Sequence, residues 1–431
     1  MRRPAKKIFY GWWIVVAGTI INSLNGGIYF YGFSNFFMAL VKEFGWSRAA
    51  ISLGSSLARL EGAFEAPLVG FLIDRVGPRR IMLFGIGLMG IGFILFSKIN
   101  SFGMYLTVFL TCLALGQGFG VYMPVHTTAA NWFIKKRSQA MGILQAGVGF
   151  GGVLVPLFAL IITQFGWRTG AVISGITILV IGLPCAGLFR HRPEPYGYLP
   201  DGRIEQTSGT ADPLSSSETI KDPAAVGTDY SPKEAVKTMA FWSMVTAFGI
   251  TQGVSGSVVL HSIPHFTDVG IPMVVAATAT GSIGMASILG RLSFGFLGDR
   301  FSKRHLLALA IALEAAGVLI FSNLDSTWQI IPFLVVFCLG YGGIQPLILA
   351  VLADFFGRKS YGTVFGLQLF FRSLPQFGLP ILAGWIFDVS GSYHAAFMLF
   401  IALLAVAGGL MLITRSPSKA SLFPMGSIHL G

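Results

Sequence analysis

The segment Gly70-Phe-Leu-Ile-Asp-Arg-Val-Gly-Pro-Arg-Arg80 occurs a second time in the same chain. The second copy, Gly295-Phe-Leu-Gly-Asp-Arg-Phe-Ser-Lys-Arg-His305, begins 225 residues further on. In both copies an apolar stretch ends at an aspartate, and a short basic loop follows it. A loop repeated in this way indicates that the chain consists of two related halves.

Two further pairs of loops follow the same spacing. Asn131-Trp-Phe-Ile-Lys-Lys136 matches Asp354-Phe-Phe-Gly-Arg-Lys359 at an offset of 223 residues, and Phe165–Ala171 matches Ser390–Ala396 at an offset of 225. The repeat therefore extends over most of each half, which is typical of duplicated membrane transporters.

Twelve apolar runs surround these loops, six in each half. A helix of about 20 residues crosses about 30 Å of hydrocarbon, and runs near that length occur at 11–40, 49–73, 81–97, 103–131, 139–163, 171–189, 238–266, 273–297, 305–321, 328–353, 362–387 and 394–414. The third and ninth runs are short. We expect a six-helix bundle over 1–189, a polar cytoplasmic linker over 190–237, a second bundle over 238–414 and a cytoplasmic tail over 415–431.

The composition agrees with a membrane location. Apolar residues make up 54% of the 431 positions, charged residues make up 11%, and the mean hydropathy is +0.72. A soluble protein carries roughly a quarter charged residues. The three cysteines lie inside apolar runs without metal-ligand spacing, so we expect no disulfide, no metal and no cofactor.

The basic residues predict the orientation. Of the 30 Lys and Arg residues, 23 fall in segments that are cytoplasmic when the N-terminus is inside, four fall outside and three lie within spans. This bias predicts a multi-pass protein of the cell inner membrane with both termini cytoplasmic. The net charge of +12 is thereby explained without a nucleic-acid partner.

The repeated loop resembles the signature between helices two and three of the major facilitator superfamily. The resemblance covers nearly the whole chain and implies an all-α fold, with two pseudo-symmetric six-helix bundles around a cavity that opens alternately to each side. It also implies that Asp74, Arg75, Asp299 and Arg300 act in gating, because charge-assisted bonds at this loop can hold one conformation. The alternative is that these residues only set the topology.

Two helical segments resemble the branch of monocarboxylate transporters and oxalate/formate antiporters. Gly290-Arg-Leu-Ser-Phe-Gly295 is similar to the helix-eight segment whose arginine binds the substrate carboxylate. Gly366-Leu-Gln-Leu-Phe-Phe-Arg-Ser373 is similar to the helix-eleven segment that carries a second cation in oxalate transporters. The resemblance thus implies substrate contacts for Arg291 and Arg372.

The sequence departs from the related patterns at three places. Ser287 occupies the position where animal monocarboxylate carriers have an aspartate, and Ala114 stands where proton-coupled drug exporters have an arginine before Gln117-Gly118. Helix five also lacks the antiporter Gly-Pro-x-x-Gly-Gly pattern. These departures disfavour drug efflux.

The depth of the two arginines supports an anion site. At 1.5 Å per residue, Arg291 lies about 12 Å from the loop at Asp299, and Arg372 lies about 15 Å into a helix that starts near Gly362. A buried charge is costly unless it lines a cavity or has a partner, and the planar guanidinium binds a carboxylate through two bonds. The alternative is that each arginine pairs with a buried acid.

Helix two carries the candidate proton carriers. Glu61 and Glu65 are four residues apart and share a helix face, whereas Arg59 points elsewhere. A buried carboxylate can carry the coupled proton. Glu65 could instead form an ion pair with Arg372 or a structural pair within the first bundle.

Four polar residues in helices four and ten complete the candidate site. Gln117, Tyr122 and Tyr341 are candidate substrate contacts, since helices four and ten line the cavity in the resembled fold. His126 is a candidate proton carrier. Each could equally be a packing residue that makes its hydrogen bonds inside the bundle.

These observations predict a secondary transporter of a small carboxylate such as lactate or pyruvate, with proton symport preferred. Exchange of the oxalate/formate type and a non-carboxylate substrate are the alternatives. No catalytic constellation or ATP-binding motif occurs in the sequence, so we expect neither an enzyme nor a primary pump. The expected partners are a small organic anion, protons and the lipid bilayer, and we expect a monomer.

Overall fold

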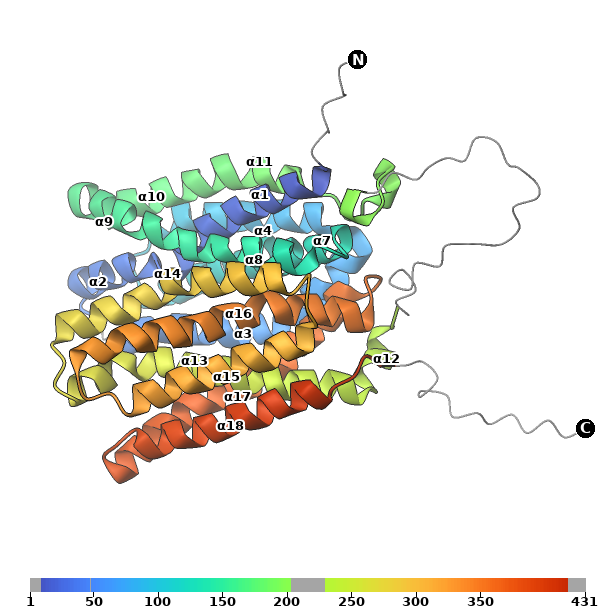
Figure 1. Ribbon diagram of the computed structural model, residues 1–431. Helices are drawn as coiled ribbons and strands as arrows, with labels where there is room; N and C mark the ends of the chain where they lie inside the picture. The colour runs from blue at the N-terminus through green and yellow to red at the C-terminus, as the bar shows by residue number, and fades with distance from the viewer. Residues whose placement is uncertain (1–8, 47, 203–228, 418–431) are drawn as a thin grey trace, which may run out of the picture.

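The computed structural model describes residues 9–46, 48–202 and 229–417 and is built from long helices (Figure 1). Each predicted span corresponds to one helical stretch. In the first half these stretches are α1–η1–α2 (Tyr10–Leu24, Asn25–Phe30, Phe33–Phe44), α3 (Arg48–Val76), α4 (Pro78–Phe96), α5–η2–α6–η3–α7 (Phe102–Val108, Phe109–Ala114, Leu115–Gln117, Gly118–Tyr122, Met123–Trp132), α8–η4–α9 (Arg137–Phe150, Gly151–Val153, Leu154–Phe165) and α10–η5–α11 (Trp167–Thr177, Ile178–Gly182, Leu183–Gly187).

The second half has fewer interruptions. Its stretches are α13 (Met239–Asp268), α14 (Met273–Leu297), α15 (Lys303–Ser322), η8–α16 (Thr327–Gln329, Ile330–Phe356), α17 (Tyr361–Ser390) and α18 (His394–Ile413). Four π-helical segments, η1, η2, η3 and η5, occur in the described part of the first half. Segments of this kind are frequent at functional sites.

Nine of the helical stretches in the described ranges are long and apolar enough to cross a membrane. The other three predicted spans are α3, α14 and α17, which carry Arg291, Arg372, Glu61 and Glu65.

Helix ends follow local chemistry. Ser101 and Thr238 accept backbone N–H bonds at the starts of α5 and α13, as N-cap residues do. Gly45 and Gly391 end α2 and α17 with positive φ angles of 66° and 70°, a conformation that glycine adopts without steric cost.

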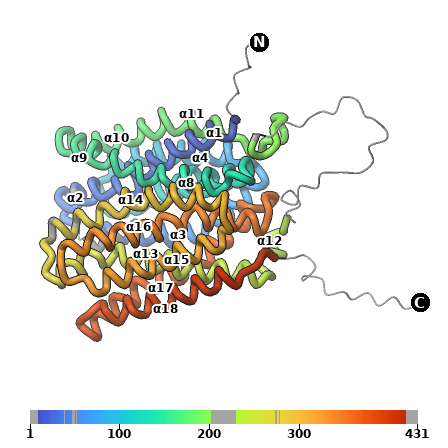
Figure 2. Tube along the Cα trace, viewed as in Figure 1, coloured from blue at the N-terminus to red at the C-terminus, as the bar shows by residue number. Residues whose placement is uncertain are grey.

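The two halves lie side by side, with α1–α11 in one body and α13–α18 in the other (Figures 1 and 2). Their contact runs along two helix pairs, α3 with α17 and α8 with α14. Glycines permit this close approach: a Cβ atom at Gly70 or Gly366 would overlap backbone atoms of the opposite helix, and one at Gly295 would lie 3.0 Å from the Cα atom of Gly142.

The described ends of the linker lie at one end of the molecule, where α11 ends and α12 begins (Figure 1); we call this the linker end. They contain η6 (Glu194–Tyr196), η7 (Pro200–Gly202) and α12 (Pro232–Val236). The predicted linker residues 203–228 and tail residues 418–431 lie outside the described residues.

Two aspartates attach the described ends of the linker to the loops at 131–136 and 354–359. Asp201 accepts N–H bonds from Lys135 at 2.8 Å and Lys136 at 3.1 Å. Asp229 accepts N–H bonds from Arg358 at 2.9 Å and Lys359 at 3.2 Å. These loops match each other in the internal repeat, so each half holds its own end of the linker in the same manner.

Candidate functional site

The aspartates of the repeated loop bind the opposite half. Asp74, near the end of α3, accepts bonds from the backbone N–H groups of Gly362 (3.1 Å) and Thr363 (2.8 Å) and from the Thr363 hydroxyl (2.8 Å). These are the first residues of α17. A carboxylate at a helix N-terminus satisfies free N–H groups and complements the helix dipole.

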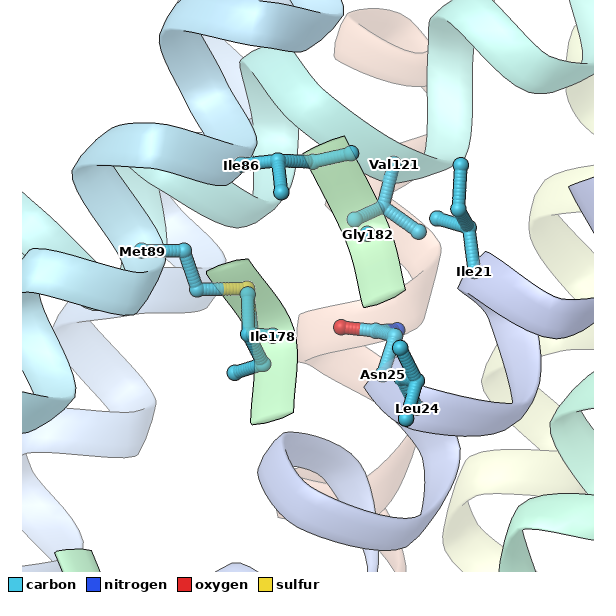
Figure 3. Close-up of a pocket in the computed structure, with 8 residues that line it drawn as sticks. All are labelled: Ile21, Leu24, Asn25, Ile86, Met89, Val121, Ile178 and Gly182. Carbon is cyan, nitrogen blue, oxygen red and sulfur yellow. The ribbon is translucent and has the colours of Figure 1, made fainter. Parts of the chain in front are cut away.

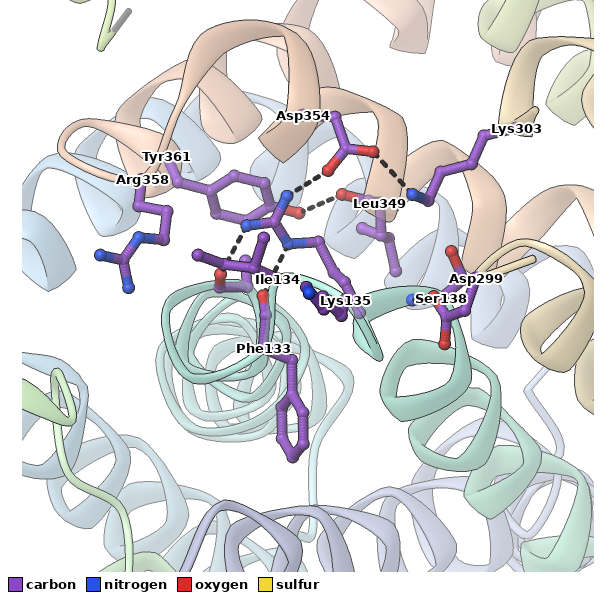
Figure 4. A network of polar contacts seen from close by, with 12 residues as sticks. Phe133, Ile134, Lys135, Ser138, Asp299, Lys303, Leu349, Asp354, Arg358 and Tyr361 are labelled. Carbon is purple, nitrogen blue, oxygen red and sulfur yellow. Dashed lines mark hydrogen bonds and ion pairs between the residues drawn. The ribbon is translucent and has the colours of Figure 1, made fainter. Parts of the chain in front are cut away.

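Asp299 makes the equivalent contact from the second half. It follows α14 and accepts N–H bonds from Ser138 (2.8 Å) and Gln139 (2.9 Å) in the first turn of α8. Figure 4 shows Asp299 beside Ser138. Burial raises the pKa of Asp299 above its usual value, and the bonds from Gln139 and Ser138 oppose that rise. Each aspartate thus caps the start of a helix in the opposite half.

The two arginines of the predicted gate contribute less to the contact between the halves than the two aspartates do. Arg75 and Arg300 are both exposed. Arg75 lies 5.9 Å from the centre of the Phe71 ring on its own helix. The aspartates therefore make the contact between the halves.

An ion pair between the buried Arg137 and the exposed Asp354 joins the halves at the linker end. Arg137 is 3% exposed, forms an ion pair with Asp354 of the opposite half, and donates from Nε to the Phe133 carbonyl at 2.9 Å. Asp354 also pairs with Lys303 at 2.8 Å (Figure 4). Sequence analysis missed Arg137, although it directly follows the quoted loop 131–136, because repetition alone does not reveal which basic residue points inward.

Arg291 lies at the contact between the halves. It is 4% exposed, and its Nη1 atom donates to the backbone carbonyl of Gln145 on α8 at 2.6 Å. Its Nε atom is buried without a partner. Ser287, at the position of the missing aspartate, is buried and its hydroxyl donates to the Gly284 carbonyl of its own helix at 2.7 Å. Arg291 therefore retains an unused donor.

Arg372 has a similar environment on α17. It is 6% exposed, and its Nε atom is also buried without a partner. Among the described residues, no ion pair within 4.0 Å includes Arg291 or Arg372. The predicted pair of Glu65 with Arg372 is not formed.

Glu65 instead lies against helix four. Its carboxyl group fills the space beside Gly118, where a Cβ atom would overlap the carboxyl oxygen. Glu61 and Glu65 each have one buried carboxyl oxygen without a partner. Tyr29 of η1 is within electrostatic range of both acids. Arg59 is exposed.

Tyr122 and His126 face the second half. The Tyr122 ring lies 4.8 Å from the His126 ring and 5.8 Å from the Phe365 ring on α17. The Nδ1 atom of His126 is 2.5 Å from the Tyr122 carbonyl oxygen, so Nδ1 is the donor and Nε2 is left buried without a partner. Gln117 is half-buried just before η3.

Tyr341 lies on the Arg291 side of the site. It is half-buried on α16, stacks on Phe337 of the same helix at 5.9 Å and is within electrostatic range of Arg291. The predicted residues therefore fall into two groups, one around Arg291 and Tyr341 and one around Tyr122, His126 and α17.

A separate small cavity lies within the first half, among α1, η1, α4, η3 and η5 (Figure 3). Its lining is apolar except for Asn25, whose Oδ1 atom is buried without a partner. The eight lining residues include none of the predicted substrate contacts: Ile21, Leu24, Asn25, Ile86, Met89, Val121, Ile178 and Gly182. This cavity is therefore distinct from the candidate site.

Solved structures with a similar fold are transporters. The outward conformation of the transporter FucP has a TM-score of 0.70 with 17% identity, covering 95% of this chain and 98% of FucP. The proton:xylose symporter XylE has a TM-score of 0.69 with 14% identity, covering 94% of this chain and 95% of XylE. At these identities the likeness concerns the fold.

Curated relatives extend the comparison to sequence. Monocarboxylate transporter 12 of Mus musculus is 27% identical over 422 residues, covering 90% of this chain and 82% of the relative. Monocarboxylate transporter 2 of Homo sapiens is 24% identical over 420 residues, covering 94% of this chain and 85% of the relative.

The profile of the Major Facilitator Superfamily matches residues 15–377 and 262–426. Together with the fold and the relatives, this match identifies the protein as a multi-pass secondary transporter and not an enzyme. The chain is a member of the Major Facilitator Superfamily.

Proposed function

We propose that the protein carries a small carboxylate across the membrane by alternating access, in symport with protons. The carboxylate is supported by the two buried arginines, which have unpartnered Nε atoms and, in the described ranges, no acid within ion-pair distance. A buried guanidinium without a counter-charge is costly, and a carboxylate ligand would supply that charge. The relatives named monocarboxylate transporters support the same substrate class.

Proton coupling is supported by the two acids of α3. Glu61 and Glu65 are part-buried, lie close to Tyr29, and each has an unpartnered carboxyl oxygen. A carboxyl group in that position is better accommodated when it is protonated. His126, with its free Nε2 atom, is the second candidate proton carrier.

The alternating motion would break and remake the contacts at the linker end. Asp74 and Asp299 hold the starts of α17 and α8 when this end is closed, and Arg137 with Asp354 adds an ion pair. We propose that the linker end faces the cytoplasm of the inner membrane, on the evidence of the 23 basic residues assigned to that side.

Uptake by purified protein in liposomes tests the proposal. Labelled lactate, formate and oxalate are supplied with and without an inward proton gradient. Uptake stimulated by the gradient is the expected result. Uptake that requires preloaded anion and ignores the gradient would replace symport with exchange, a second candidate that the two arginines with unpartnered Nε atoms favour. No uptake of any of the three would contradict the carboxylate assignment.

A further inference from the structure

Gln368 on α17 is fully buried, at 0% exposure, and both its Oε1 and its Nε2 atoms lack a hydrogen-bond partner. Among the described residues, the one acceptor and two donor hydrogens of this side chain therefore have no partner. Buried polar groups are normally paired, and each one that is not calls for an explanation. A bound ligand that completes these bonds is such an explanation.

The position of Gln368 connects it to the proposed substrate site. It precedes Arg372 by four residues, so the two side chains are neighbours on one helix face, with Cβ atoms about 5–6 Å apart. Phe365, three residues before Gln368, shares that face and lies 5.8 Å from the Tyr122 ring of the opposite half. Gln368 and Arg372 therefore lie on the side of α17 that meets helix four.

Other unpartnered atoms lie along the same contact. The Nε atom of Arg372 and the Nε2 atom of His126 are both buried without partners among the described residues, and the His126 ring lies tilted beside the Tyr122 ring at 4.8 Å. Unpaired donors and acceptors thus occur on both sides of this contact.

The chemistry of Gln368 restricts the ligand. A carboxylate or a keto oxygen can only accept, so it would leave Oε1 unpaired, and an ammonium group can only donate, so it would leave Nε2 unpaired. A hydroxyl group accepts and donates through one oxygen, which satisfies both atoms of the amide. A 2-hydroxy carboxylate carries that hydroxyl next to the group that Arg372 would bind.

We propose that Gln368 selects the hydroxyl group of a 2-hydroxy carboxylate whose carboxylate is bound by Arg372. This inference rests on the proposed carboxylate transport and adds a residue that discriminates among carboxylates. Hydroxy acids are bound in preference to keto acids and to unsubstituted acids of the same length, because only the hydroxyl completes both bonds of the amide.

The test compares lactate, pyruvate and propionate, which share three carbons and differ at carbon two. Uptake in liposomes and the rise in melting temperature on binding are measured for each. For the wild-type chain we expect apparent affinity for lactate to exceed that for propionate by about tenfold, the effect of one or two hydrogen bonds. In Gln368→Leu this ratio falls towards one, while propionate transport is retained.

Two controls separate selection from structure. Ser373→Ala, beside Arg372, removes a hydroxyl that already donates to the Phe370 carbonyl of its own helix at 2.6 Å, so it leaves the ratio unchanged. Gln368→Leu should melt no lower than the wild type, since it removes an unpaired polar group from the interior. If that variant does not fold, Gln368→Met takes its place as an unbranched apolar side chain.

The outcomes are distinguishable. An unchanged lactate-to-propionate ratio in Gln368→Leu, with transport intact, would overturn the role of Gln368 and leave carboxylate transport standing. A wild type that transports lactate, pyruvate and propionate equally well would also overturn the role of Gln368 and leave carboxylate transport standing. A wild type that neither binds nor transports any of them would overturn both the inference and the proposed function.

Discussion

The two arginines that we propose bind the substrate are both buried, and neither has an acidic partner among the described residues. Arg291 differs from Arg372 in one respect, because it donates to the Gln145 carbonyl of the other half. It therefore combines a contact between the halves with a free Nε atom, which would link ligand binding to the relative position of the halves. Arg372 has no such bond among the described residues.

Arg291→Lys tests the need for the guanidinium. Lysine keeps the charge but lacks the planar pair of donors, and we expect carboxylate affinity to fall by about tenfold to a hundredfold, as for the loss of a charge-assisted bond. Liposome uptake and a melting curve measure function and folding separately. Full uptake by a well-folded Arg291→Lys protein would remove this residue from the site.

Gly118→Ala tests the contact between helix four and Glu65. The added methyl group would overlap the Glu65 carboxyl, so we expect a loss of about 1–3 kcal/mol in stability. Gly87→Ala is the matched control, because no atom lies within 4 Å of a Cβ at that position. Adding Glu65→Ala to Gly118→Ala should recover much of the loss; equal stability of the two glycine variants would show that Glu65 does not occupy this space.

At the scale of helices, the sequence predicted the bounds of the described helical stretches within a few residues, and nine of these stretches are long and apolar enough to cross a membrane. Hydrocarbon thickness sets both helix length and apolar content. The sequence did not predict the four π-helical segments or the positive φ of Asp201, because these depend on packing and on contacts with distant loops. Asp74 and Asp299 were identified from the repeat. Their partners, the N–H groups that begin α17 and α8, required the tertiary structure.

Replacing Asp74 should destabilise only the start of α17, and replacing Asp299 should destabilise only the start of α8. In Asp74→Ala, hydrogen exchange at Gly362 and Thr363 should speed up while exchange at Ser138 and Gln139 stays unchanged, and Asp299→Ala should give the reverse. The loss of a cap costs about 0.5–2 kcal/mol. Asp388→Ala, at an exposed position on α17, is the control. Faster exchange at both helix starts in either variant would mean that the caps act as one cooperative unit.

For the whole molecule, candidate residues were easier to find than their roles. Arg291, Arg372, Glu61 and Glu65 stand out in any apolar sequence, because charges are rare there. Gln368 and Arg137 do not stand out: a glutamine within a span and an arginine in a basic loop are ordinary until burial and missing or distant partners are known. The predicted Glu65–Arg372 pair was wrong because equal depth does not imply contact.

The ion pair between the halves should respond unequally to loss of its two members. Asp354→Ala leaves Arg137 buried without a counter-charge, and we expect it to cost about 3–5 kcal/mol. Arg137→Ala should cost less, because Asp354 keeps Lys303 at 2.8 Å. Melting temperatures in detergent give the comparison, with Arg137→Met combined with Asp354→Leu as the control that removes both charges of the Arg137–Asp354 pair. Equal losses for the two single variants would contradict the buried-charge argument.

The attachment of each linker end to its own half has a practical consequence. Asp201 and Asp229 fasten the two described ends of the linker to their own halves, and Glu194 also pairs with Arg358 of the second half at 2.7 Å. Rocking of the halves would therefore act on the Glu194–Arg358 pair as well as on the residues between the two aspartates. A fluorescent reporter domain inserted between Asp201 and Asp229 would leave the bonds of both aspartates in place. A reporter in the linker would thus follow the distance between the halves during a transport cycle without a change to any helix.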